Sequence, residues 1–227
     1  MGTIDEAKRI AARAALDELP HEGVVGLGSG STAKLFIDGV GELVRAGRKL
    51  VGVPTSEASR AQALALGIPL LPDDGPWQLD VCVDGADEAD PTLDLIKGGG
   101  AAHTREKIVN HAARKNVIIV DASKLSPRLG TKWPVPIEVL PFAHLTTRAH
   151  LARFGTPVLR SREGAAVSTD AGNLIYDLAT GPIENASVLD HALHAVPGVV
   201  ETGLFIRRCD LLIVAEPDGS VRRLQRP

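Results

Sequence analysis

Short, continuously apolar segments alternate with amphipathic helical segments through the first half of the chain, and this alternation limits the possible folds. A strand that is apolar along its whole length is buried on both faces, which is typical of a parallel sheet covered by helices on both sides. The pattern therefore predicts an α/β fold with a Rossmann-like parallel sheet. The expected strands are residues 24–27, 49–53, 68–71, 79–83 and 117–120, and the expected helices are residues 4–14, 35–47, 57–66 and 104–115.

The pattern changes after Ser126. The segments that follow are expected in the order β-α-β-β-α-β, which suits a second, smaller ferredoxin-like α+β domain. Residues 133–140 contain prolines and are expected to form an edge strand or a linker, because proline cannot donate a hydrogen bond within a sheet. The other expected elements are helices 143–154 and 187–196, strands 157–160 and 199–205, and a hairpin of 165–169 with 174–178.

An apolar strand at 211–215 and a short final strand are expected to rejoin the first domain. We therefore predict a Rossmann-like domain, which carries the functional site, formed by residues 1–128 and 206–227. Residues 129–205 are predicted to form the small α+β domain.

Composition narrows the classes of partner. The chain carries a net charge of −3 and 3% aromatic residues, which favours neither nucleic acids nor anionic membranes as partners. No apolar segment approaches the roughly 20 residues that span a bilayer. Cys82 and Cys209 are isolated, which predicts two reduced core thiols. Together with a charged N-terminal segment that lacks a signal-peptide core, these features indicate a cytoplasmic protein.

A glycine-rich loop, Gly28-Ser29-Gly30-Ser31-Thr32-Ala33, follows the first predicted strand. Backbone N–H groups and a helix N-terminus converge on such a turn, so we expect an anion site with hydroxyl donors from Ser29, Ser31 and Thr32. The loop also fits the dinucleotide pattern G-x-G-x-x-A. The three hydroxyl residues favour a terminal phosphate, and the acid that would bind a ribose is poorly placed. A tight turn without a ligand is the remaining alternative.

The strand at 79–83 ends abruptly in Asp84-Gly85-Ala86-Asp87-Glu88. Open α/β sheets bind ligands at the carboxyl ends of their strands. Asp84 and Asp87 can both face one crevice there, where crowding would leave one acid and one base for proton transfer between sugar hydroxyls. Two alternatives stay open. One is a solvated acidic turn, and the other is a magnesium site formed by the three acids of this run with Asp90, because hard cations prefer oxygen ligands.

Lys97 is followed by three glycines, Gly98, Gly99 and Gly100. Consecutive glycines let the backbone approach a ligand closely, at an entropic cost that a simple linker would not require. A lysine and exposed amides that face a reacting oxygen would stabilise an enediolate. A Schiff base on Lys97 is an alternative that aldose–ketose chemistry does not require.

Glu106 lies in the first turn of the next predicted helix. Most helical glutamates are solvated surface residues, and that is the alternative here. A carboxylate that is held after a glycine loop and partly desolvated could instead remove a proton from carbon. The seven histidines show no metal-ligand spacing, and only His103 lies near the predicted site, where we expect a loop residue.

These motifs together resemble ribose-5-phosphate isomerase type A. The resemblance covers nearly the whole chain in order, and its most specific parts are residues 84–88, 97–102 and 104–107. It implies interconversion of D-ribose 5-phosphate and D-ribulose 5-phosphate in the non-oxidative pentose phosphate pathway, through an enediolate and without metal or organic cofactor. The family is usually dimeric or tetrameric, so the resemblance implies a homodimer or homotetramer. Further matching motifs are residues 28–33, 121–124, 197–200 and 203–205.

The resemblance also implies residue roles. Glu106 is the base that moves a proton between C2 and C1, while Asp84 and Asp87 line the sugar site and assist ring opening and proton transfer between hydroxyls. Two positions depart from the family pattern: Ser29, where threonine is more frequent, and His103, where the residue is usually apolar. The implied substrate contacts are the catalytic Lys97, the phosphate loop Ser29, Gly30, Ser31 and Thr32, and also Gly85, Ala86, Gly98, Gly99, Gly100 and Lys124.

Three other functions explain the sequence less well than the isomerase does. A sugar-phosphate sensor of the repressor type would need a DNA-binding module, and nothing basic or helix-turn-helix-like precedes Val24. An amino-sugar phosphate deaminase or an acyl-CoA transferase could use a similar sheet, but neither explains the full set of motifs.

Overall fold

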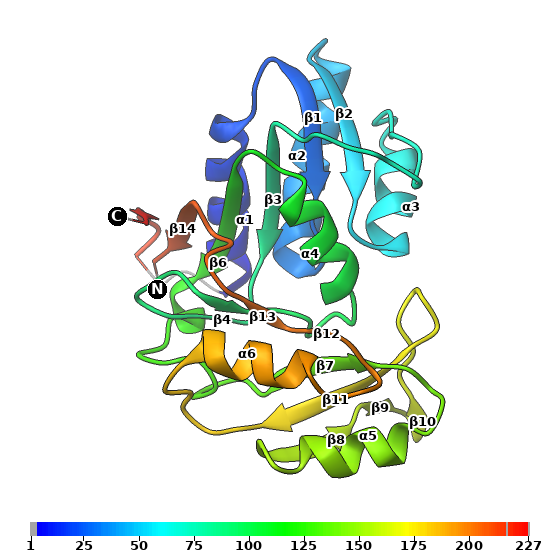
Figure 1. Cartoon of the computed structure of the whole chain (residues 1–227). Helices are drawn as coiled ribbons and strands as arrows, with labels where there is room; N and C mark the ends of the chain where they lie inside the picture. Colours follow the sequence, from blue (N-terminus) through cyan, green and yellow to red (C-terminus); the bar gives the residue numbers. More distant parts are fainter. Residues whose placement is uncertain (1–3, 217, 227) are drawn as a thin grey trace. The chain divides into compact units, whose positions relative to one another are not determined.

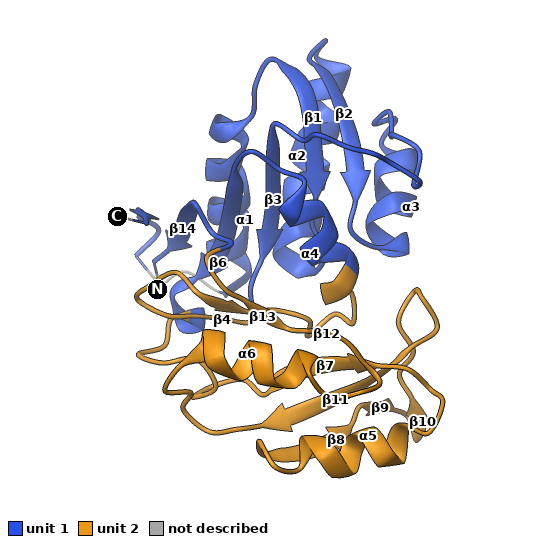
Figure 2. Ribbon diagram, in the orientation of Figure 1, with its two compact units in different colours: residues 1–86, 105–124, 208–227 blue, residues 87–104, 125–207 orange. Residues whose placement is uncertain are grey.

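The computed structural model describes residues 4–216 and 218–226, and the chain divides into two compact units (Figure 2). Unit 1 comprises residues 1–86, 105–124 and 208–227, and unit 2 comprises residues 87–104 and 125–207. The predicted first domain includes residues 87–104, 125–128 and 206–207. In the structure these residues belong to unit 2. The reason is that β4 (Glu88–Ala89) and β5 (Leu95–Ile96) form a small sheet with β13 (Leu204–Phe205).

Unit 1 is built on a six-stranded sheet in the order β15-β14-β6-β3-β1-β2 (Figure 1). The neighbours from β2 to β14 are parallel, and β15 is antiparallel to β14. The expected parallel sheet is confirmed, and the strand at 211–215 joins it beside β6. The expected strand at 68–71 is reduced to one bridge between Gly52 and Leu70. The strands are β1 Glu22–Leu27, β2 Lys49–Pro54, β3 Val81–Gly85, β6 Asn116–Asp121, β14 Leu211–Ala215 and β15 Val221–Gln225.

Both faces of this sheet are covered by helices. Val25 and Leu27 of β1 belong to the core that contains α1 (Ile4–Ala15), α2 (Ser31–Arg45) and α3 (Glu57–Ala65). Val24 faces the opposite core, which contains Val109 of α4 (His103–His111). Because successive side chains of a strand point to opposite faces, a strand between two cores must be apolar throughout.

Helix α4 is shorter than the predicted 104–115. It ends at His111, and the Leu79 N–H then donates to the Ala112 carbonyl at 3.0 Å while the Arg114 N–H donates to the Leu79 carbonyl at 2.9 Å. The backbone groups that would continue the helix are used in this bridge to the start of the β3 segment. None of the helices within residues 4–216 and 218–226 is long and apolar enough to cross a membrane.

Unit 2 contains a four-stranded antiparallel sheet in the order β12-β7-β11-β8. With its two helices it follows the predicted β-α-β-β-α-β order. Its core includes Ile137, Tyr176 and Leu193. The elements are β7 Val135–Val139, α5 His144–Leu151, β8 Thr156–Leu159, β11 Leu174–Ala179, α6 Ala186–His194 and β12 Val199–Thr202, with β9 Ser161–Arg162 and β10 Ala165–Ala166 as a separate pair.

The prediction of an edge strand or linker at 133–140 is wrong, since β7 is an inner strand between β12 and β11. Its proline is tolerated because of where the missing donor points. The Pro136 carbonyl accepts the Gly203 N–H at 2.7 Å, beyond the last β12 pair, Thr202 with Ile137. The N–H and C=O of a strand residue point to the same side, so the proline nitrogen faces the end of β12 and removes no ladder bond to β11.

Two further strand predictions need correction. The expected strand 199–205 is divided, because residues 199–202 pair with β7 and residues 204–205 pair with β5. The expected hairpin of 165–169 with 174–178 is reduced to one bridge between Ser168 and Leu174. β11 pairs instead with β7 and β8, while β10 pairs with β9. In these long-range pairings Ile175, Tyr176 and Leu178 of β11 are completely buried.

Gly26 in β1 provides a test of this packing. A Cβ atom there would lie 2.7 Å from Cys82 Sγ and 2.9 Å from Val109 Cγ1. We expect Gly26→Ala to lower the free energy of unfolding by about 1–3 kcal/mol, measured by denaturant unfolding, because an added carbon forces shifts in a packed core. Gly85→Ala on the adjacent strand is the matched control, since its Cβ would meet only the Ile119 carbonyl at 3.8 Å. A Gly26→Ala protein as stable as the control would contradict this description.

Candidate functional site at the carboxyl edge of the sheet

The carboxyl edge of the unit 1 sheet gathers several predicted site residues. β1, β3 and β6 are parallel, so their carboxyl ends lie at one edge. The glycine loop follows β1, Asp84 is the penultimate residue of β3, and Lys124 ends a 3-10 turn, Ala122–Lys124, directly after β6. Because α4 leads back to the amino end of β6, its first turn with Glu106 also lies at the carboxyl edge.

Asp84 and the glycine loop are in direct contact. The Asp84 side chain is 2% exposed, and its Oδ1 atom accepts the N–H of Ser29 at 2.9 Å and of Gly85 at 2.7 Å. The Gly28 N–H donates to the Val83 carbonyl at 3.0 Å. A Cβ atom on Gly28 would lie 2.6 Å from Asp84 Cα, so only glycine permits this approach. The carboxylate is thereby held in one orientation at the edge of the sheet.

The other end of the loop opens helix α2. Gly30 occupies the N-cap position with φ 102°, a conformation that favours glycine, and it has no side chain to cap the first-turn amides. Ser31 is exposed and Thr32 is half-buried. Uncapped amides at a helix N-terminus together with these hydroxyls can bind an anion.

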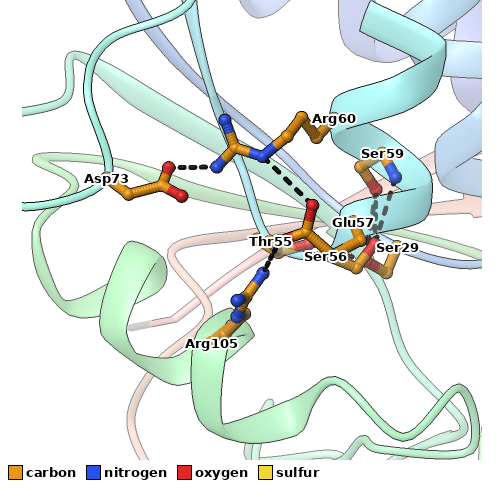
Figure 3. Close-up of polar contacts among 8 residues, drawn as sticks. All are labelled: Ser29, Thr55, Ser56, Glu57, Ser59, Arg60, Asp73 and Arg105. Atoms are coloured by element: carbon orange, nitrogen blue, oxygen red, sulfur yellow. Dashed lines mark hydrogen bonds and ion pairs between the residues drawn. The ribbon is translucent and has the colours of Figure 1, made fainter. Parts of the chain in front are cut away.

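The hydroxyl of Ser29 has partners that the sequence analysis missed (Figure 3). Its Oγ atom lies 2.8 Å from Thr55 Oγ1, 2.7 Å from Ser56 Oγ and 3.2 Å from Ser59 Oγ. These three residues follow β2 and begin α3. The sequence shows a polar break after the second strand at this point, but it does not show that the break adjoins the glycine loop.

Charged residues connect the same segment to α4 (Figure 3). Glu57 accepts a hydrogen bond from Arg105 Nη1 at 2.7 Å and forms an ion pair with Arg60 Nε at 3.3 Å. Arg60 also donates to Asp73, and this hydrogen bond raises the pKa of the Arg60 guanidinium above its ordinary value. Arg105 adjoins Glu106 in the sequence, so the first turns of α3 and α4 are linked beside the predicted base.

Glu106 is buried, with 4% of its surface exposed, in the first turn of α4. It is therefore not the solvated helix residue that was the alternative. One turn further along, Val109 packs against Val53, Leu79 and Cys82, which anchors the helix to the sheet. A carboxylate removed from water on a packed helix has the environment that a carbon-acid base requires.

Asp87 and the glycine run lie together in unit 2. Asp87 Oδ2 accepts the Gly99 N–H at 2.7 Å, and a Cβ atom on Gly99 would lie 2.7 Å from Asp87 Oδ1. Lys97 is 3% exposed; its N–H donates to the Gly203 carbonyl at 2.9 Å, and its Nζ atom lies 5.4 Å from the centre of the Phe205 ring. Gly100 is exposed, and a Cβ atom there would meet nothing within 4 Å among the described residues.

The expectation of a loop position for His103 is wrong. His103 is the first residue of α4 and is completely buried, with Nε2 3.4 Å from the Glu201 carbonyl. A Cβ atom on Gly98 would lie 2.7 Å from His103 Nδ1, and Gly98 has φ 109°. The imidazole therefore packs directly under the first glycine of the run.

Arg160 is a residue that the sequence analysis missed. Its Nη1 atom donates to the carbonyls of Gly98 at 2.7 Å and Gly99 at 3.3 Å. Asp177 holds the same guanidinium through Nε at 2.9 Å and Nη2 at 2.5 Å. No local pattern marks Arg160, because the two glycines that it contacts lie more than 60 residues away in the chain.

The acids named in the magnesium alternative each have protein donors. Glu88 is completely buried and accepts the N–H groups of Gly130, Lys132 and Trp133 at 2.9–3.1 Å. Asp90 accepts from Thr92 and Asp94. Glu88 and Asp90 therefore shape loops of unit 2.

The predicted site residues thus form two groups, one within each unit. The chain passes between the units at 86–87, 104–105 and 124–125, beside Asp87, Glu106 and Lys124. Unit 1 holds Ser29, Gly30, Ser31, Thr32, Asp84, Gly85, Ala86, Glu106 and Lys124, and unit 2 holds Asp87, Lys97, Gly98, Gly99 and Gly100.

Comparison with known proteins identifies the family of the chain. Residues 51–219 match the family model of ribose 5-phosphate isomerase A (phosphoriboisomerase A). Ribose-5-phosphate isomerase A of Thermosynechococcus vestitus is 45% identical, covering 94% of this chain and 92% of that protein, and the Caulobacter vibrioides protein is 46% identical, covering 96% and 97%.

Solved structures of similar proteins have the same fold as this chain. A D-ribose-5-phosphate isomerase in complex with phospho-erythronic acid has a TM-score of 0.95 and 40% identity, covering 99% of this chain and 100% of that chain. Ribose 5-phosphate isomerase A from Methanocaldococcus jannaschii has a TM-score of 0.92 and 38% identity, covering 98% and 100%. The chain therefore belongs to the ribose 5-phosphate isomerase A family.

Proposed function

We propose that the chain interconverts D-ribose 5-phosphate and D-ribulose 5-phosphate as an aldose–ketose isomerase of the non-oxidative pentose phosphate pathway. The observation that carries this proposal is its 45% identity to an isomerase of this family over 94% of the chain. The complex of a related isomerase with phospho-erythronic acid supports a sugar phosphate as the substrate class. The same match favours the isomerase over the sensor, the deaminase and the transferase considered above.

Glu106 is the base in the proposed reaction. Its carboxylate takes the proton from C2 of the open-chain aldose, and the electrons of that C–H bond form the C1–C2 double bond of an enediolate as O1 gains charge. The proton then returns to C1 while the hydroxyl proton of O2 moves to O1, so that O2 becomes the ketone and O1 a hydroxyl. The burial of Glu106 supports this role, because a desolvated carboxylate is a stronger base toward carbon. The two carbons exchange oxidation states, so the reaction needs no external oxidant.

Asp84, Asp87 and Lys97 serve the substrate oxygens in this proposal. The two aspartates assist ring opening and move protons between hydroxyls. Gly85 and Ala86, which stand between them in the sequence, line the sugar. Lys97 and the amides of Gly98, Gly99 and Gly100 stabilise the enediolate oxygens, since donors that are already oriented stabilise charge as it develops.

The phosphate is assigned to the start of α2 and to Lys124. The amides and hydroxyls of Ser31 and Thr32 supply donors after Gly30, and Lys124 supplies a cation at the same sheet edge. Ser29 is included as a loop residue of this site.

We further propose that the protein is a cytoplasmic homodimer or homotetramer that acts without nucleic-acid or membrane partners. An apolar surface between β7 and α5 supports self-association, because Phe142 is 88% exposed and lies between Leu140 and Leu145, which are 48% and 64% exposed. Cys82 and Cys209 are buried thiols, which suits a reducing compartment.

Incubation with D-ribose 5-phosphate in heavy water tests the reaction directly. Ketose should form, and deuterium should enter at C1 because the proton on Glu106 can exchange with solvent before it returns to carbon. NMR of the product measures both. A matched incubation without protein is the control. If no ketose forms, the proposed function is wrong. If ketose forms but never carries deuterium, the proton is not transferred by a base whose proton exchanges with solvent.

Removing the base should separate turnover from binding. We expect Glu106→Gln to lower kcat by about 10²- to 10⁴-fold, because general base catalysis typically contributes that much. Substrate affinity, measured by calorimetry, should change little, since the amide keeps the shape of the side chain. Glu42→Gln on the exposed face of α2 is the matched control. A Glu106→Gln enzyme that keeps the kcat of wild type would remove Glu106 from the mechanism.

Metal removal addresses the magnesium alternative. We expect activity to persist after dialysis against excess EDTA, because lysine, amides and a helix N-terminus can meet the substrate charges. The measurement is the rate of ketose formation before and after dialysis. Loss of activity that returns with added Mg²⁺ would favour the magnesium site instead.

A further inference from the structure

The hydroxyl cluster beside the glycine loop has no role in the reaction steps above. It consists of Ser29, Thr55, Ser56 and Ser59 (Figure 3). Thr55, Ser56 and Ser59 are 0%, 8% and 4% exposed. Buried hydroxyls need partners, and each has a single proton to donate. The direction of these protons therefore decides what the Ser29 hydroxyl can do.

The protons can be followed from one hydroxyl to the next. Ser59 Oγ donates to the Gly28 carbonyl at 2.6 Å, so it is the acceptor in its 3.0 Å contact with Ser56 Oγ. Ser56 Oγ in turn accepts from Ser29 Oγ at 2.7 Å and from the Ser59 N–H at 3.1 Å. The result is a directed chain from Ser29 through Ser56 and Ser59 to the Gly28 carbonyl.

Both donors of Ser29 are therefore used within the protein. Its N–H goes to Asp84 Oδ1 at 2.9 Å, and its hydroxyl proton goes to Ser56. Thr55 Oγ1 donates its own proton to the Leu27 carbonyl at 3.1 Å, so in its 2.8 Å contact with Ser29 Oγ it can only accept, and the Ser29 proton stays directed into the protein. Phosphate oxygens are acceptors, so a ligand for them must offer a donor.

We propose that Ser29, Ser56 and Ser59 form a hydroxyl chain that positions the glycine loop against Asp84, and that the Ser29 hydroxyl is not a phosphate ligand. This hydroxyl chain starts at Ser29 and ends at the Gly28 carbonyl. The start of α3 therefore holds the glycine loop at two neighbouring residues. Ser29, Ser56 and Ser59 are positioning residues that act through Asp84. This inference rests on the proposed function, because it assigns how one loop of that site is held.

A break in the chain has a specific consequence. Without the Ser56 acceptor the Ser29 hydroxyl must find another partner, and the turn that presents the Ser29 N–H to Asp84 is less constrained. The defect should fall on proton transfer by Asp84, and thus on kcat. Phosphate affinity should be largely kept, because it depends on Ser31, Thr32 and Lys124.

A double-mutant cycle tests the inference. We expect Ser29→Ala and Ser56→Ala each to lower kcat by about tenfold, since small misplacements of reacting groups have effects of this order. The inhibition constant of inorganic phosphate should stay within about threefold of wild type. The kcat of the double variant should lie no more than about twofold below that of the less active single variant, because both substitutions break the same hydroxyl chain and their effects do not add.

Three variants serve as controls. Lys124→Ala should raise the inhibition constant of inorganic phosphate, which shows that the assay detects a lost phosphate contact. Ser29→Thr keeps the hydroxyl and should restore kcat to within about twofold of wild type, which separates the hydroxyl from any folding defect of Ser29→Ala. Ser187→Ala, exposed on α6, should change neither constant.

Two kinetic results would overturn the inference. One is a Ser29→Ala enzyme with phosphate inhibition weakened at least about tenfold beside a Ser56→Ala enzyme with wild-type inhibition, which would make the Ser29 hydroxyl a direct ligand. The other is a double variant whose loss is the product of the two single losses.

Failure of the proposed function would be visible separately, as wild-type protein without turnover. The hydroxyl chain is then tested by hydrogen exchange of the backbone amides of residues 28–32. Their exchange should be faster in Ser56→Ala than in wild type. An unchanged exchange rate would overturn the inference independently of activity.

Discussion

The close approach of the β1–α2 turn to Asp84 is the contact on which the candidate site depends. The Gly28 N–H meets the Val83 carbonyl and the Ser29 N–H meets the Asp84 carboxylate, each within 3.0 Å. This approach requires glycine at position 28, because a Cβ atom would overlap the backbone of Asp84. One residue without a side chain thus lets the glycine-rich turn and the acid occupy neighbouring positions on the same sheet edge.

The buried carboxylates Asp84, Glu88 and Glu138 differ in the groups that hold them. Both oxygens of Glu88 are occupied by three backbone N–H groups, and Glu138, 1% exposed, accepts from Thr104, Thr169 and Asn173. Such carboxylates act as fixed acceptors that shape loops. Asp84 Oδ1, the oxygen next to the turn, accepts two backbone N–H groups, so the turn itself orients this carboxylate.

The sequence predicts the parallel sheet of unit 1 well, because that fold depends on local patterns, while the roles of the candidate site residues stay predictions. Apolar strands ending in acids identify the carboxyl edge, and glycine runs identify close approaches. What it misses depends on long-range pairing. Nothing near Pro136 indicates that β7 is an inner strand, since that is decided by where Gly203 meets it. Arg160 and Ser59 are missed for the same reason, because the glycine carbonyls to which they donate, of Gly98 and Gly28, lie 62 and 31 residues away.

The glycine run illustrates how a flexible sequence becomes a rigid donor array. Its first peptide unit is held at both ends, with the Gly98 carbonyl accepting from Arg160 and the Gly99 N–H donating to Asp87, each at 2.7 Å. The next carbonyl, of Gly99, also accepts from Arg160. Because a trans peptide points its C=O and N–H in opposite directions, the Gly100 N–H is turned away from the guanidinium. Arg160 therefore orients an amide without touching it, and an amide oriented in advance needs no reorganisation when charge develops on an oxygen nearby.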